Sequence, residues 1–202
     1  MMLSTIAGVD EAGRGPLAGP VVAAAVIIPD NFPTSGIQDS KQLTAKQRSY
    51  FYALIKTRCL AMGVGIIEPD EIDQLNIYHA TYKAMRIAVD SLKIIPKKIA
   101  VDGNRTIPDL PMEQEALIRG DAYHPSIVCA GIVAKVTRDR LMLKLHEEYP
   151  QYGFRRHKGY GTVLHLKALK EHGVSPIHRK SFAPVRDVLD RPNNKVISSI
   201  QS

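Results

Sequence analysis

Apolar residues along the chain alternate between short unbroken runs and longer stretches with helical spacing. Short runs of Val, Ala and Ile bounded by Gly, Pro or charged residues are typical of buried strands. They occur at 6–9, 21–28, 60–67, 99–102 and 117–118. Helical spacing predicts helices at 44–58, 69–75, 77–92, 126–149 and 162–170, the first with a capping box formed by Thr44 and Gln47. This alternation of strands and helices predicts an α/β layered fold.

The glycine-containing segment 150–161 is the predicted joint between two parts of the chain. We expect an α/β domain at 1–150 and a mainly helical extension at 151–202. No internal repeat or low-complexity tract suggests a further division.

Charge is uneven, although the 202 residues have ordinary globular proportions, 45% hydrophobic and 23% charged. Residues 1–130 carry a net charge of −1, whereas residues 131–202 carry +8. A basic segment of this kind commonly follows the phosphates of a polyanion, so it favours a nucleic-acid partner. The alternative is a basic surface that serves only solubility.

Several classes of protein are disfavoured by the same composition. No stretch approaches the roughly 20 apolar residues of a membrane helix, and the N-terminus lacks the pattern of a signal peptide. Cys59 and Cys129 lie far apart and outside any CxxC pair, which supports neither a disulfide framework nor a zinc site. We therefore expect a cytoplasmic monomer with no membrane partner.

Four acidic residues follow predicted strands: Asp10, Glu11, Asp102 and Asp121. If those strands are neighbours, their side chains converge, and clustered carboxylates raise one another's pKa unless a cation neutralises them. Oxygen ligands suit Mg²⁺ and Mn²⁺, and two such ions would activate a water and stabilise the leaving oxygen of a phosphodiester. The alternative for each residue is a helix cap or turn former.

The segment 10–20 contains closely spaced glycines without the pattern of a phosphate-binding P-loop, and a strand follows it. Gly13 and Gly15 flank Arg14, and their lack of side chains would let the backbone approach a ligand. Backbone groups beside metal-binding carboxylates could read a ribose 2′-hydroxyl. A tight hairpin that needs positive φ is the alternative interpretation.

Seven motifs spread over nearly the whole chain resemble those of the bacterial ribonuclease HII family. They are Gly8-Val-Asp-Glu-Ala-Gly-Arg-Gly-Pro16, Asp39-Ser-Lys-Gln-Leu43, Val101-Asp-Gly103, Gly120-Asp121, Ala134-Lys-Val-Thr-Arg-Asp139, His157-Lys-Gly-Tyr-Gly-Thr162 and Ser175-Pro-Ile-His-Arg-Lys-Ser-Phe-Ala-Pro184. The resemblance implies a ribonuclease H-like mixed sheet flanked by helices, with 1–150 as the catalytic domain and 151–202 completing the substrate-binding surface. It also implies cleavage of RNA in RNA–DNA hybrids and 5′ of ribonucleotides embedded in duplex DNA, by two-metal hydrolysis that leaves 3′-hydroxyl and 5′-phosphate ends.

Individual roles follow from the same resemblance. Asp10, Glu11, Asp102 and Asp121 would bind Mg²⁺ or Mn²⁺, and Gly13, Arg14 and Gly15 would contact the ribonucleotide. Tyr160 would pack on the neighbouring deoxyribose, since a 2′-hydroxyl would clash with its ring or be desolvated by it. A core or hinge tyrosine is the alternative. The expected phosphate contacts are Lys41, Lys158, Arg179 and Ser181.

Two residues depart from the family pattern. Cys129 and Gly131 stand where the family generally carries alanine and serine. A glycine inside a helix costs up to about 1 kcal/mol relative to alanine, so we expect a local loss of stability and unchanged chemistry.

Two other functions compete with the ribonuclease interpretation. A non-catalytic duplex-binding protein would explain the basic segment but not the carboxylates. A related two-metal nuclease acting on DNA junctions would explain both, but it would ignore a 2′-hydroxyl.

Overall fold

The computed structural model describes residues 5–37 and 43–190 of the chain. The strands are β1 (Ile6–Ala12), β2 (Val21–Ile27), β3 (Ala61–Ile67), β4 (Lys98–Asp102) and β5 (Glu113–Leu117). The α-helices are α1 (Ala45–Arg58), α2 (Pro69–Asp90), α3 (Pro125–Glu148), α4 (Phe154–His157), α5 (Val163–His172) and α6 (Ala183–Leu189). Short 3-10 turns, η1 (Gly120–Ala122) and η2 (Pro150–Tyr152), precede α3 and α4. No helix within the described ranges is long and apolar enough to cross a membrane.

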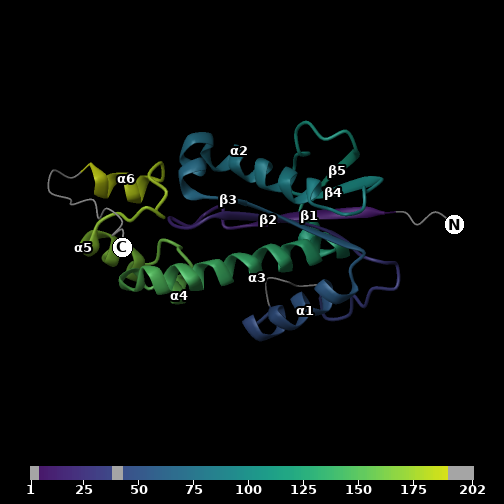
Figure 1. Cartoon of the computed structure of the whole chain (residues 1–202), viewed down its shortest axis with the longest axis horizontal. Helices are drawn as coiled ribbons and strands as arrows, with labels where there is room; N and C mark the ends of the chain where they lie inside the picture. The colour runs from purple at the N-terminus through teal and green to yellow at the C-terminus, as the bar shows by residue number, and fades with distance from the viewer. Residues whose placement is uncertain (1–4, 38–42, 191–202) are drawn as a thin grey trace. The chain divides into compact units, whose positions relative to one another are not determined.

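The strands form one mixed sheet in the order β3-β2-β1-β4-β5. β1 pairs antiparallel with β2 and parallel with β4, which in turn pairs parallel with β5. All seven residues of β2 are buried, which explains its unbroken apolar sequence. In Figure 1 the start of α3 lies on one side of the sheet and the later half of α2 on the other.

Glycines allow both helices to approach the sheet closely. A Cβ added to Gly8 of β1 would lie 2.1 Å from the backbone carbon of Ser126, at the start of α3. On β3, a Cβ at Gly65 would lie 2.0 Å from the carbonyl oxygen of Ala84 in α2. No side chain fits at either distance, so these glycines are required by packing.

The chain folds into two compact units built from interleaved segments. The first, the sheet unit, comprises 1–12, 22–66 and 81–137, and the second, the C-terminal unit, comprises 13–21, 67–80 and 138–202. This division differs from the expected joint at 150–161, because the glycine-rich loop and part of α2 belong to the C-terminal unit. Leu17 of that loop packs in one core with Leu169 and Val185.

Local signals predicted several elements correctly. Thr44 and Gln47 form the expected capping box at the start of α1. The helices expected at 69–75 and 77–92 are joined as α2, with Asn76 at φ 63° between them. The Asn76 side chain accepts a hydrogen bond of 2.9 Å from the backbone N–H of Tyr78, and so caps the second half of the helix.

Candidate active site

The four predicted carboxylates all lie in the sheet unit. Asp10 and Glu11 are in β1, Asp102 ends β4, and Asp121 lies in η1. Because Val9 pairs with Val101 in parallel register, Asp10 and Asp102 follow at the same level of adjacent strands. The backbone N–H of Asp121 lies 3.3 Å from Oδ1 of Asp102. Strand pairing and this contact bring the acidic side chains into one region.

Asp10 is the centre of the acidic group. Its side chain is buried, at 9% exposure, and a hydrogen bond of 2.7 Å from the N–H of Glu11 reaches Oδ1. Burial raises the pKa of Asp10 well above its ordinary value, and the neighbouring Glu11, Asp102 and Asp121 carboxylates raise it further. Such mutual repulsion is what a divalent cation relieves.

The donor set suits a hard cation, because all four side chains offer carboxylate oxygens. Among residues 5–37 and 43–190, no three acidic, histidine or cysteine side chains are gathered tightly enough to hold an ion by themselves. Mg²⁺ typically takes only one or two carboxylates and completes its shell with water and substrate phosphate. An ion bound here would therefore need oxygens from water and a phosphodiester in addition to those of the carboxylates.

Gly131 of α3 leaves space for the Asp10 carboxylate. A Cβ at Gly131 would lie 2.4 Å from Oδ2 of Asp10, closer than any real contact. The sequence indicated only the cost of a glycine in a helix, because the partner strand is more than a hundred residues away. The departure from the family's serine therefore bears on the position of the Asp10 carboxylate.

We expect Gly131→Ala to reduce cleavage roughly tenfold, because the new methyl group displaces the Asp10 carboxylate by a large part of an ångström. The overlap opposes the gain in helix propensity, which is up to about 1 kcal/mol for alanine over glycine. Initial cleavage rates at limiting Mg²⁺ and thermal unfolding would measure both effects. Cys129→Ala is the control in the same helix, and equal rates for the two variants would disprove the role of Gly131.

Two buried arginines shape the glycine-rich loop in the C-terminal unit. The Arg179 guanidinium donates hydrogen bonds to the carbonyl oxygens of Gly13, Arg14 and Gly19 at 2.7, 2.9 and 3.0 Å. Arg138 donates to the carbonyls of Pro20 at 2.9 Å and Ala18 at 3.1 Å. Together they bind five carbonyls of one loop.

Both guanidiniums remain charged at neutral pH despite their burial. Desolvation lowers the pKa of Arg138 to about 10 and that of Arg179 to about 9. Gly13 has φ 98°, and a Cβ there would lie 2.1 Å from Nε of Arg138. Gly13 is therefore required both by its backbone conformation and by the arginine beside it.

The structure places the side chain of Arg179, a predicted phosphate contact, inside the C-terminal unit and not on its surface. Its side chain is completely buried, and three loop carbonyls occupy the guanidinium. The family resemblance implied a phosphate contact for Arg179, and nothing in its local sequence indicates that the side chain is buried. Sequence reasoning also missed the loop-binding role of Arg138, for which the Thr-Arg-Asp sequence of the family motif was the available signal.

The side chains of Lys158 and Ser181, two other expected phosphate contacts, form hydrogen bonds within the protein. The Lys158 ammonium donates to the carbonyl of Arg155. The Ser181 hydroxyl donates to Oδ1 of Asp73 at 2.6 Å. Lys41 lies outside the described residues.

Tyr160 and Gly15 lie side by side in the C-terminal unit. The position of a Cβ on Gly15 is 3.8 Å from Cε1 of the Tyr160 ring, which is 45% exposed. The backbone N–H of Leu17 donates to the carbonyl of Gly159 at 2.8 Å, so the two loops are tied together. The ring is thus available on the surface beside the exposed Arg14 and Gly15.

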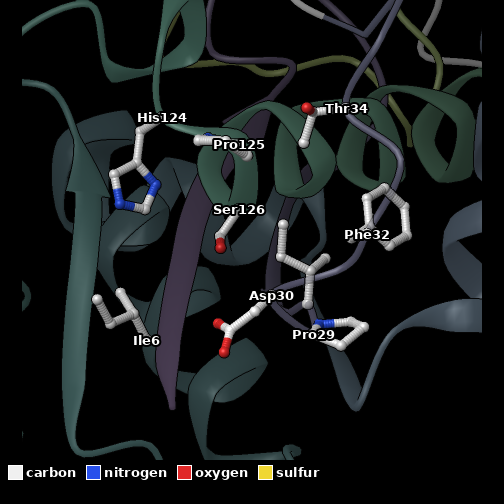
Figure 2. A pocket seen from close by; sticks show the side chains of 9 residues that line it. Ile6, Pro29, Asp30, Phe32, Thr34, His124, Pro125 and Ser126 are labelled. Carbon is white, nitrogen blue, oxygen red and sulfur yellow. The ribbon is translucent and has the colours of Figure 1, made fainter. Parts of the chain in front are cut away.

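A cavity of about 270 Å³ in the sheet unit is separate from this chemistry. Its apolar wall includes Ile6, Pro29 and Phe32. Figure 2 shows His124 and Asp30 bordering the same space. Ile6 begins β1, four residues before Asp10, and none of the four carboxylates lines the cavity. The acidic group is therefore distinct from this pocket.

Comparison with known proteins agrees with these observations. The sequence model of the ribonuclease HII family matches residues 7–185. A ribonuclease HII of Burkholderia lata is 56% identical over 185 residues, covering 92% of this chain and 86% of the relative. A ribonuclease HII of Bacillus thuringiensis is 51% identical over 189 residues, covering 94% of this chain and 73% of the relative.

A solved structure supports the fold. The crystal structure of ribonuclease H2 from Pyrococcus horikoshii has a TM-score of 0.78 and 30% sequence identity, covering 91% of this chain and 96% of that one. The expected ribonuclease H-like mixed sheet flanked by helices is confirmed. This chain belongs to the ribonuclease HII family.

Proposed function

We propose that this member of the ribonuclease HII family, an endoribonuclease of RNA–DNA hybrids, also incises duplex DNA on the 5′ side of embedded ribonucleotides. We further propose that the divalent cations needed for this cleavage are bound by Asp10, Glu11, Asp102 and Asp121. The observation that carries the proposal is the buried Asp10, whose pKa is raised by burial and by the three neighbouring carboxylates. A site that concentrates negative charge around a strand end is suited to Mg²⁺ or Mn²⁺ and a phosphate.

Strand pairing and one backbone contact position the Asp10 and Asp102 side chains. When bound, two divalent cations supply an activated water and stabilise the leaving 3′-oxygen. Asp10 and Asp102 offer oxygens from adjacent strands, and the N–H of Asp121 holds Oδ1 of Asp102 in place. The products expected are a 3′-hydroxyl and a 5′-phosphate.

Recognition of the ribonucleotide is assigned to the C-terminal unit. Backbone groups of Gly13, Arg14 and Gly15 would contact the 2′-hydroxyl, because the buried arginines fix the path of this loop. The exposed ring of Tyr160 would pack on the next deoxyribose. Lys158 and Ser181 would contact phosphates, as Lys41 would from outside the described residues.

Matched duplexes test this function. One contains a single ribonucleotide, the other is all DNA of the same sequence, and each is incubated with Mg²⁺, Mn²⁺ or a chelator. We expect cleavage only of the ribonucleotide-containing duplex and only with metal. Equal cleavage of both would favour a DNA junction nuclease. Tight, salt-sensitive binding without cleavage would favour a non-catalytic duplex-binding protein.

We expect Tyr160→Ala to reduce incision at a single ribonucleotide by roughly tenfold to a hundredfold, since a displacement of about 1 Å at the reacting phosphate can cost about a hundredfold in rate. Cleavage within a long RNA–DNA hybrid, which offers no deoxyribose on the cleaved strand beside most sites, should fall less. Tyr50→Ala, which removes an exposed ring on α1, is the control. Equal losses on both substrates would contradict the role of Tyr160 in reading the junction.

The cellular setting is also part of the proposal. We expect the protein to act in the cytoplasm as a monomer, with residues 151–202 contributing Lys158, Tyr160 and Ser181 to substrate binding. Sedimentation of the purified protein with and without duplex would test the monomer.

A further inference from the structure

Two completely buried histidines of the C-terminal unit have no part in the proposed chemistry. His165 of α5 and His178 each have 0% exposure, and their Nε2 atoms lie 3.1 Å apart. A hydrogen bond between two imidazole nitrogens requires that one carries a proton and the other does not. The pair therefore has a direction, which the surrounding contacts determine.

The direction runs from Ser175 to Tyr160. Nδ1 of His165 lies 3.0 Å from the carbonyl oxygen of Tyr160, and because a carbonyl only accepts, this nitrogen carries the proton. In a neutral ring, Nε2 of His165 is then the acceptor and Nε2 of His178 the donor. Nδ1 of His178 in turn accepts from the Ser175 hydroxyl at 2.7 Å and the Ser175 N–H at 3.1 Å. We name this chain the Ser175–His178–His165 relay.

Both rings are held in the neutral state that the relay needs. Burial lowers the pKa of His165 to about 4, and burial with the adjacent imidazole lowers the pKa of His178 to about 3. A second proton on His165 would place two N–H groups against each other at the central contact, and a second proton on His178 would place its Nδ1–H against the N–H of Ser175. At neutral pH all hydrogen bonds of the relay are therefore formed.

A third histidine holds the residue before Tyr160. The His157 ring stacks on His165 with centroids 4.6 Å apart. The N–H of Gly159 lies 3.3 Å from Nδ1 of His157, whose Nε2 lies 2.9 Å from the carbonyl of Tyr152. The backbone at 159–160 is thus bonded to two histidine rings, through the amide of Gly159 and the carbonyl of Tyr160.

The other end of the relay is joined to the glycine-rich loop. His178 forms an isolated antiparallel bridge with Ala18. The neighbouring residues add two backbone hydrogen bonds to this bridge. The N–H of Gly19 donates to the carbonyl of Ile177 at 2.9 Å, and the N–H of Arg179 donates to the carbonyl of Leu17 at 2.8 Å. One hydrogen-bonded assembly therefore connects the loop that carries Gly15 with the backbone that carries Tyr160.

We propose that the Ser175–His178–His165 relay positions Tyr160 beside Gly15 and so determines how strictly the enzyme recognises the junction between a ribonucleotide and a deoxyribonucleotide. The proposal rests on the assigned role of Tyr160 in binding the deoxyribose. His165 and His178 are positioning residues, because neither needs to touch the substrate.

A double-mutant cycle tests the coupling. His165→Phe keeps an aromatic ring in the stack but removes both hydrogen bonds, and we expect it to lower incision at a single ribonucleotide about tenfold. His165→Gln retains a donor and an acceptor and should recover most of the rate. Combining His165→Phe with Tyr160→Ala should cost no more than Tyr160→Ala alone. Additive losses, or equal losses on long hybrids, would overturn the proposal.

A measurement that does not need activity tests the relay itself. In ¹⁵N NMR of the wild-type protein at pH 7, we expect His165 protonated at Nδ1 and His178 protonated at Nε2. The opposite tautomers, or a charged ring, would overturn the relay even if every variant were poorly folded. The wild type could show these tautomers and still fail to cleave any ribonucleotide-containing duplex. That result would refute the proposed function and the role in selectivity, but it would not contradict the hydrogen bonds of the relay.

Discussion

Asp10→Asn is expected to abolish metal-dependent cleavage and, in the absence of metal, to stabilise the folded protein. Asparagine has nearly the same shape as aspartate but removes the negative charge that a divalent cation needs. Metal ions supply several kcal/mol of transition-state stabilisation, so the rate should fall by at least about 10³-fold. Single-turnover cleavage of a labelled hybrid would measure the loss, and duplex binding should largely survive.

The gain in stability follows from the raised pKa of Asp10. Burial and like charge raise this pKa in the folded state, so ionisation at neutral pH favours the unfolded chain. The penalty develops as the pH rises above the ordinary aspartate pKa of about 4, and a tenfold difference in acidity between the folded and unfolded states corresponds to about 1.4 kcal/mol. In EDTA at pH 7 the Tm of Asp10→Asn should therefore exceed that of the wild type.

A matched control separates this effect from a general change of charge. Asp30→Asn replaces an exposed aspartate of the same unit and should alter neither rate nor Tm. An Asp10→Asn protein that is inactive but less stable than the wild type would show that misfolding, not loss of a metal ligand, explains the result. Full activity would refute the catalytic assignment.

Arg179→Met is expected to destabilise the protein by at least about 2 kcal/mol, since the buried carbonyls of Gly13 and Gly19 lose a donor and each unsatisfied buried group costs about 1–3 kcal/mol. Methionine replaces the aliphatic stem of arginine but not its guanidinium, and it donates no hydrogen bond. The loop at 13–19 should lose its fixed path. Urea unfolding would measure the stability, and incision below the new Tm would report the loss of ribonucleotide recognition.

Arg186→Met serves as the control, because Arg186 is an exposed arginine of α6 in the same unit. A phosphate-binding role for Arg179 would instead weaken duplex binding and reduce its salt dependence, with little effect on stability. That pattern would support a phosphate contact for Arg179.

Features set by local sequence were predictable. The capping box of α1 and the buried run of β2 depend on residues within a few positions of one another. The acidic residues were identified because they end strands, and the parallel pairing of β1 with β4 then aligns Asp10 with Asp102. The sequence alone does not show that β1 and β4 are neighbours in the sheet, so their adjacency had to be assumed.

Features set by distant contacts were not predictable. The local sequence around Arg179 gives no sign that its side chain is buried. Its burial depends on hydrogen bonds to carbonyls about 165 residues earlier in the chain. Gly131 resembles a weak point of a helix until the Asp10 carboxylate is placed beside it. The C-terminal unit likewise recruits residues 13–21, a pairing that neither hydrophobic spacing nor charge indicates.

The most direct test of the proposed carboxylate chemistry is the nature of the cut ends. A duplex with one ribonucleotide would be cleaved with Mg²⁺ or Mn²⁺, and both fragments would be analysed by mass spectrometry. Two-metal hydrolysis predicts a 3′-hydroxyl on the upstream DNA and a 5′-phosphate on the ribonucleotide, with no product for Asp10→Asn or in chelator. A 2′,3′-cyclic phosphate, or cleavage without metal, would contradict it, because the ribose hydroxyl would then be the nucleophile.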